Sequence, residues 1–249
     1  MTGKPHLGAP TGRIQSWMAA FSWVFIARVG AGGASFLCVV LIARSLGPAR
    51  FSEFAILLAL MRVAAEFVGP ALDTALVRFA ARHIGFDGDP SHDQSLPYFR
   101  VMLWVKVAFA LLLIVVGFVG ATPIRALLFD VDSAPGDISA LAVPLAFLGA
   151  GSTLLWAYAQ AYFQAHQQFT RYAFFDMANA IARLLLVAVV FLTGYTTSTL
   201  FLGAYVVSQA VLAFVIGTRL PVVRLLTARM DVSGIARRMF GFTKWVIVA

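Results

Sequence analysis

The sequence predicts an all-α, polytopic membrane protein with six transmembrane helices and the start of a seventh. Hydrophobic residues occupy 61% of the 249 positions, whereas charged residues occupy only 12%. A soluble domain of this length cannot bury so much apolar surface, but a bilayer accepts it as solvent. The apolar segments do not alternate with polar residues as barrel strands do, so we expect helices to satisfy the backbone hydrogen bonds in lipid.

Six apolar segments each approach the ~20 residues that a helix needs to cross ~30 Å of hydrocarbon. They cover Trp17–Ala43, Phe54–Val77, Val101–Val119, Ile138–Phe163, Tyr172–Leu192 and Thr199–Gly217. The first is too long for the core of a signal peptide and is expected to remain as a helix. The short amphipathic segment Thr122–Phe129 is expected to lie in the membrane interface without crossing.

The chain divides into two parts. Residues 1–217 form the predicted six-helix transmembrane domain, and residues 218–249 form a basic linker with the opening of a seventh helix. Arg219–Phe240 carries five arginines on an amphipathic background and is expected to lie on the cytoplasmic surface. Phe240–Ala249 becomes apolar again but is too short to cross, so we expect these residues to open a helix of a larger protein.

Lysine and arginine residues predict the orientation. With the N-terminus in the cytoplasm, twelve of the 19 lie on the cytoplasmic side and three on the outer side. The three outer residues are Arg44, Arg50 and Arg125. The net charge of +8 is therefore assigned to a basic cytoplasmic face and not to nucleic-acid binding.

Five charged residues inside the predicted helices are candidates for a substrate cavity. Arg28 and Arg183 are each the twelfth residue of their segment and lie too deep to reach the interface easily. Arg62 precedes Glu66 by four residues and Asp176 precedes Arg183 by seven, so each pair shares a helix face. Two interpretations stay open: ion pairs that hold helices together, or a cationic cavity in which Arg28 and Arg183 bind phosphate.

Other charged residues give no catalytic or metal-binding pattern. Lys106 is six residues into the third segment and is expected to reach the cytoplasmic interface, while Asp73 lies close to the helix face of Glu66. Asp87–Asp89 and Asp130–Asp132 each spell D-x-D, but turn-forming neighbours favour ordinary loops. No metal-ligand spacing, cofactor motif or nucleophile–base arrangement is present, so we predict no cofactor and no enzyme activity.

Three segments resemble a known transporter family. Ile42–Ala55 (IARSLGPARFSEFA) joins the first two predicted helices, and Gly69–Ala81 (GPALDTALVRFAA) ends the second. Gln160–Arg171 carries glutamines and a basic residue after the fourth helix. In these features the chain resembles the Wzx-type oligosaccharide flippases, which are polysaccharide transporters of the multidrug/oligosaccharidyl-lipid/polysaccharide exporter superfamily. The resemblance covers essentially the whole chain but only the first half of the family.

The resemblance implies an N-terminal lobe of six helices, paired with a second lobe around a central cavity. It implies alternating-access movement of an undecaprenyl-diphosphate-linked oligosaccharide from the inner to the outer leaflet, for polysaccharide biosynthesis. The implied setting is a bacterial or archaeal cytoplasmic membrane. The implied partners are membrane lipids, the anionic lipid-linked oligosaccharide, and either the missing C-terminal lobe or a second copy.

Three alternatives stay open at this level. A drug or cation antiporter of the same superfamily would favour unpaired acidic residues in the cavity, whereas the deepest charge without an acidic residue in its own segment is Arg28. A membrane-bound sugar polymerase or ligase would need a large outer loop with catalytic residues, and the predicted outer loops are short. The third alternative is an inactive, truncated remnant.

Overall fold

The computed structural model describes residues 11–67, 69–84, 95–129 and 140–220, with side chains from residue 22 onward. The described residues form helices and connecting turns, in agreement with the predicted all-α class. The helices are α1 (Thr11–Glu66), α2 (Gly69–His83), α3 (Leu96–Val119), α4 (Ala121–Leu128), α5 (Ala142–Ala165), α6 (Phe169–Thr193) and α7 (Ser198–Arg219). The short helix α4 coincides with the predicted interfacial segment Thr122–Phe129 to within one residue at each end.

Five described helical segments are long and apolar enough to cross a membrane. The first, Ser22–His83, is 62 residues long and contains most of the first predicted helix and all of the second. At 1.5 Å per residue this segment measures about 90 Å, far more than one bilayer crossing requires. The predicted loop between Ala43 and Phe54 is wrong, because helix continues on both sides of a single break.

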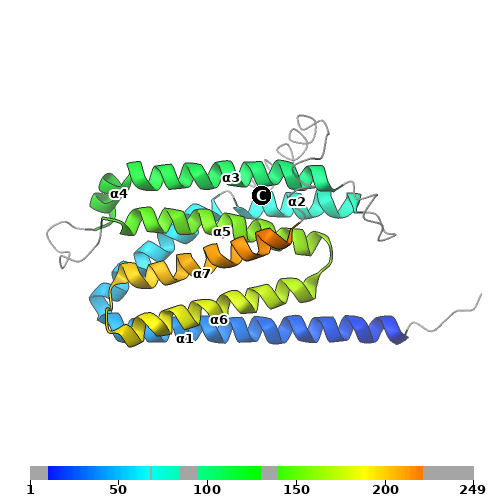
Figure 1. Ribbon diagram of the computed structural model, residues 1–249, viewed down its shortest axis with the longest axis horizontal. Helices are drawn as coiled ribbons and strands as arrows, with labels where there is room; N and C mark the ends of the chain where they lie inside the picture. Colours follow the sequence, from blue (N-terminus) through cyan, green and yellow to red (C-terminus); the bar gives the residue numbers. More distant parts are fainter. Residues whose placement is uncertain (1–10, 68, 85–94, 130–139, 221–249) are drawn as a thin grey trace, which may run out of the picture.

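The break in α1 lies at Gly47, whose φ of 69° and ψ of 175° are not helical. This region of backbone space is open essentially to glycine alone. Pro48 follows and cannot donate a backbone hydrogen bond to the preceding turn. We call residues 11–46 the first arm of α1 and residues 48–66 the second arm. Figure 1 shows the first arm in blue along α6, and the second arm leading back toward α2.

Replacing Gly47 by alanine is therefore expected to destabilise the fold by about 1–3 kcal/mol, since a Cβ strains this backbone conformation. Gly32→Ala is the matched control, because Gly32 lies inside the first arm and no atom lies within 4 Å of an added Cβ. That control should be neutral or stabilising by up to about 1 kcal/mol. Thermal unfolding in detergent measures both changes, and equal midpoints would contradict the assigned role of Gly47.

A second break separates α1 from α2. The helix ends at Glu66, and α2 begins at Gly69 with Pro70 in its first turn. Proline is accepted at this position because its missing N–H would have no partner there. The pair Gly69-Pro70 therefore interrupts the segment Phe54–Val77 that the hydropathy predicted as one helix.

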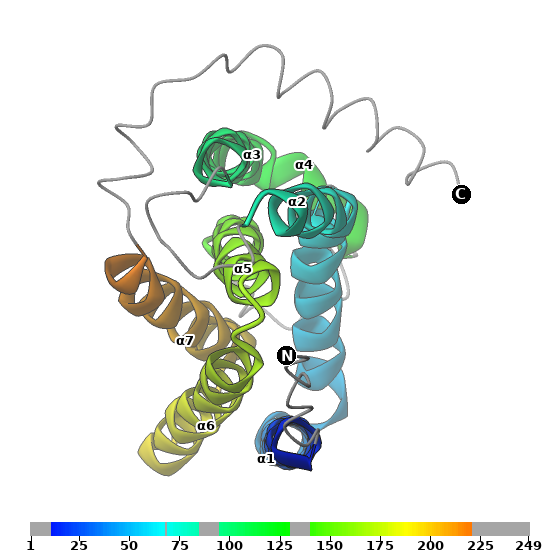
Figure 2. The ribbon, with the colours of Figure 1, turned by 90° about the vertical axis from the view of Figure 1, so that its right-hand side faces the viewer.

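Helix α5 is the centre of the lobe. In Figure 2 it lies between α3, α7 and the second arm of α1, and α2, α3 and α7 all pack against it. Most of its residues are buried, including Ala142, Ala146, Ala150 and Leu154. At Gly149 an added Cβ would lie 2.5 Å from Met61 Sδ, so glycine allows the second arm to approach α5 closely. Gly149 therefore serves close helix packing.

Two further predictions fall on residues that the structure does not describe. One is the basic linker with the opening of a seventh helix, apart from its first residues up to Leu220. The other is the loop interpretation of Asp87–Asp89 and Asp130–Asp132. Both stay predictions.

Candidate substrate cavity

A cavity of about 210 Å³ lies between the second arm of α1 and helices α5, α6 and α7. Three of the five predicted site residues, Arg62, Glu66 and Arg183, line it. The remaining lining residues are Met61, Ala65, Thr153, Tyr205 and Gln209. The cavity therefore combines two guanidinium groups, one carboxylate and three uncharged polar side chains.

Arg183 is held in place by groups from two neighbouring helices. Its Nη2 donates a hydrogen bond of 2.5 Å to Ser35 Oγ on the first arm of α1. The Ser35 hydroxyl in turn donates to the Ala31 carbonyl oxygen, at 2.8 Å. The guanidinium carbon lies 4.8 Å from the ring centroid of Tyr205 on α7, within cation–π range. These contacts orient the charged group without neutralising it.

One nitrogen of Arg183 keeps its hydrogen-bonding capacity. Its Nε is buried and has no hydrogen-bond partner within the part of the chain that the structure describes. One turn earlier on α6, Asn179 Oδ1 is also buried and without a described partner. Since buried polar groups normally find partners, this stretch of α6 has bonding capacity left for a ligand or an ordered water.

Arg62 and Glu66 come from adjacent turns of the second arm and both are exposed on this lobe. The described contacts include no ion pair between them, in contrast to the first interpretation of these residues. Opposite them, the Thr153 hydroxyl lies 2.8 Å from the Gly149 carbonyl oxygen and 3.1 Å from Gln209 Oε1. One side of the cavity is thus charged and open, and the other is polar and packed.

Arg28 and Asp176 form a separate polar cluster. Arg28 Nη2 donates to the Tyr172 hydroxyl at 2.6 Å, and its Nε lies 3.9 Å from Asp176 Oδ2. Gln160 on α5 donates to the other carboxylate oxygen of Asp176, at 3.4 Å. Asp176 therefore pairs with Arg28 of α1 and not with Arg183 of its own helix, which was the predicted partner.

The two clusters share one face of α6. Asp176 and Arg183 are seven residues apart, which corresponds to about 10 Å along a helix axis. Arg28 keeps 60% of its side chain exposed despite its contacts, so it can also reach a ligand. The structure therefore does not place Arg28 and Arg183 in one cavity. Arg28 of α1 contacts the face of α6 that carries Asp176, and Arg183 lies further along that same face.

The expectation for Lys106 is wrong. Its side chain is only 1% exposed and forms an ion pair with Asp73 of α2. Its Nζ also donates to the Leu154 carbonyl oxygen of α5, at 3.3 Å. Lys106 therefore points into the lobe and joins α2, α3 and α5, because a buried ammonium group needs a carboxylate and a carbonyl in place of water.

Several residues of the two clusters did not enter the sequence-based prediction. Ser35, Thr153 and Gln209 are polar positions inside long apolar segments, and such positions are costly in lipid unless a partner is present. Their polarity could therefore have indicated that these three residues have polar partners in the folded protein. Tyr172 and Tyr205 gave no comparable signal, because tyrosine is common both in apolar packing and at membrane interfaces.

Comparison with known proteins identifies the family. Residues 18–241 match the family described as polysaccharide biosynthesis protein. The chain belongs to this family. The polysaccharide biosynthesis family comprises transporters of the Wzx type and not enzymes, in agreement with the motifs at Ile42–Ala55 and Gly69–Ala81. No match to the chain was found among the curated proteins or the solved structures.

Proposed function

We propose that this polysaccharide biosynthesis family member is one lobe of a flippase for undecaprenyl-diphosphate-linked oligosaccharides. The lobe crosses the cytoplasmic membrane six times, with its N-terminus inside, and the break at Gly47 joins the first two crossings. Alternating access carries the substrate from the inner to the outer leaflet. The observation that supports this most is the placement of Arg62 and Arg183 in one cavity among apolar helices.

The dimensions and chemistry of the cavity fit the head of such a substrate. A volume of about 210 Å³ is below the ~300–1,000 Å³ typical of whole small-molecule ligands. It can accept a diphosphate, while the glycan would occupy space beyond it. Guanidinium groups bind phosphate oxygens through two parallel hydrogen bonds, which favours Arg62 and Arg183 as the diphosphate ligands.

The exposed side of the cavity supports a second lobe. Arg62, Glu66 and Arg28 are exposed on this lobe although each belongs to a segment predicted to cross the membrane. Charged groups at membrane depth normally face protein or a water-filled cavity. A C-terminal lobe, or a second copy, would provide the opposite wall.

Glu66 favours one competing function. A carboxylate in the cavity is the group with which a drug or cation antiporter would bind a positively charged substrate. Two arginines in the same space oppose that binding through like-charge repulsion. The flippase is therefore the first proposal and the antiporter the second.

Reconstituted vesicles test the two proposals together. The protein expressed from its full reading frame is inserted into vesicles that contain a fluorescent undecaprenyl-diphosphate oligosaccharide, and leaflet transfer is followed by chemical quenching. We expect transfer to exceed that of protein-free vesicles, and no uptake of a cationic dye. Dye uptake without lipid transfer would favour the antiporter, and the absence of both activities would favour an inactive remnant.

Arg28→Ala is expected to lower the transfer rate about tenfold or more, because a hydrogen bond to a charged group contributes about 1.5–3 kcal/mol. Membrane abundance should not change, since most of the Arg28 side chain is exposed. Tyr172→Phe is the control, because it removes the hydroxyl partner of Arg28 but keeps the guanidinium. Normal transfer by Arg28→Ala would exclude Arg28 from the substrate path.

A further inference from the structure

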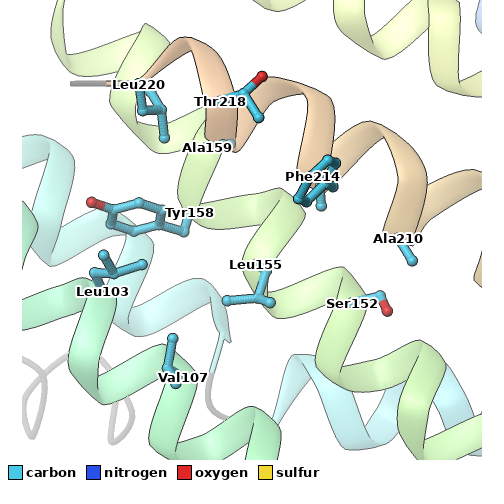
Figure 3. Close-up of a pocket in the computed structure, with 12 residues that line it drawn as sticks. Leu103, Val107, Ser152, Leu155, Tyr158, Ala159, Ala210, Phe214, Thr218 and Leu220 are labelled. Carbon is cyan, nitrogen blue, oxygen red and sulfur yellow. The ribbon is translucent and has the colours of Figure 1, made fainter. Parts of the chain in front are cut away.

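A second, apolar groove of about 550 Å³ lies between α3, α5 and α7, on the other side of α5 from the charged cavity. Helices α3 and α7 each pack on α5, which forms the floor. Figure 3 shows Leu103 and Val107 on one wall, Leu155 on the floor and Phe214 on the other wall. The groove lies between segments that are long and apolar enough to cross a membrane.

The lining of the groove is apolar, because its hydroxyl groups already donate hydrogen bonds to backbone oxygens. The Tyr158 hydroxyl donates to the Phe99 carbonyl oxygen at 3.1 Å. The hydroxyls of Ser152 and Thr218 donate to the backbone oxygens of Leu148 and Val215 within their own helices. A sugar or a phosphate would find no donor here, whereas an alkyl chain loses nothing by burial.

The groove has the depth of one leaflet. Its α7 wall runs from Ala210 to Leu220, and ten helical residues correspond to about 15 Å. That length is half of a ~30 Å hydrocarbon core. One end, marked by Leu103, Thr218 and Leu220 in Figure 3, lies where α3 begins and α7 ends.

Two arginines occupy the end at the membrane surface. Arg219 is exposed and lies between the lining residues Thr218 and Leu220. Arg100 precedes Leu103 by three residues and therefore shares its face of α3. Basic groups beside a groove between transmembrane helices are complementary to anionic lipid head groups.

From these observations we propose that the groove binds one anionic glycerophospholipid of the cytoplasmic leaflet. One acyl chain lies along α5, and the phosphate is paired with Arg219. The site is separate from the cavity of Arg62 and Arg183 and needs no oligosaccharide. The leaflet follows from the proposed orientation, but the lipid selectivity does not depend on the proposed transport activity.

Native mass spectrometry of the purified protein tests this site, with phosphatidylglycerol and phosphatidylcholine of identical chains supplied in equal amounts. We expect phosphatidylglycerol adducts to exceed phosphatidylcholine adducts about tenfold. Ala213→Trp fills the groove and should remove the adduct. Val211→Trp is the control, because Val211 is 53% exposed on the same helix outside the groove lining.

Arg219→Gln keeps the test valid if Ala213→Trp fails to fold, since Arg219 is exposed at the end of α7. It should retain a lipid adduct but lose most of the preference for phosphatidylglycerol. Equal binding of the two lipids by the unmodified protein would overturn the proposal. So would persistence of the adduct in folded Ala213→Trp. The absence of any lipid adduct on the folded, unmodified protein would overturn it as well.

Discussion

Asp73→Leu is expected to destabilise the lobe by about 3–5 kcal/mol, because it leaves the ammonium group of Lys106 buried without a counter-ion. Lys106 is 1% exposed and packs at the junction of α2, α3 and α5. Water cannot reach it to replace the lost carboxylate. The measurement is the free energy of unfolding in mixed detergent micelles, with α-helical circular dichroism as the signal.

Two variants separate this effect from a general sensitivity to charge removal. The double variant Asp73→Leu/Lys106→Met should recover most of the lost stability, since apolar residues can replace a complete buried ion pair at little cost. Asp176→Asn should cost less than about 1 kcal/mol, because its partner Arg28 is 60% exposed. If Asp73→Leu were no more harmful than Asp176→Asn, the buried pair would not stabilise the fold.

Arg183→Gln is expected to lower substrate transfer about 100-fold, because a bidentate guanidinium–phosphate pair contains two charge-assisted hydrogen bonds of about 1.5–3 kcal/mol each. Arg183→Lys should retain part of the activity, since lysine keeps the charge but not the two parallel bonds. The measurement is leaflet transfer of the fluorescent lipid-linked oligosaccharide, at protein levels matched by quantitative immunoblot.

Ser35→Ala is the matched control for Arg183. It removes the hydroxyl that accepts the hydrogen bond from Nη2 but leaves the guanidinium over Tyr205. We expect a change of less than about tenfold in transfer. Normal transfer by Arg183→Gln would remove Arg183 from the substrate path. Loss of the folded protein would assign the residue to helix packing instead.

The fold was predictable to the extent that it depends on hydropathy and on backbone-restricted residues. The apolar segments predicted the α3, α5, α6 and α7 helices. The connection around Gly47 was not predictable in the same way. The first apolar segment ends at Ala43 and the next begins at Phe54, whereas a single glycine conformation suffices to redirect an otherwise helical chain.

The charged residues were harder to place, because depth along a helix gives no information on partners from other helices. Lys106 was assigned to the interface by its distance from the helix end, but Asp73 lies beside it only in the folded lobe. Arg28 and Arg183 were grouped by equal depth, yet tertiary packing gives them different neighbours. The convergence of Arg62, Glu66 and Arg183 likewise depends on the angle between α1 and α6.

The buried pair of Asp73 and Lys106 also has a consequence for biogenesis. Each charge alone disfavours partitioning from the translocon into lipid, by about 2.5–3.5 kcal/mol at the helix centre. Asp73 emerges from the ribosome 33 residues before Lys106. We therefore expect the helix that carries the carboxylate to partition into lipid more readily once α3 has emerged, because Asp73 and Lys106 then offset each other's charge.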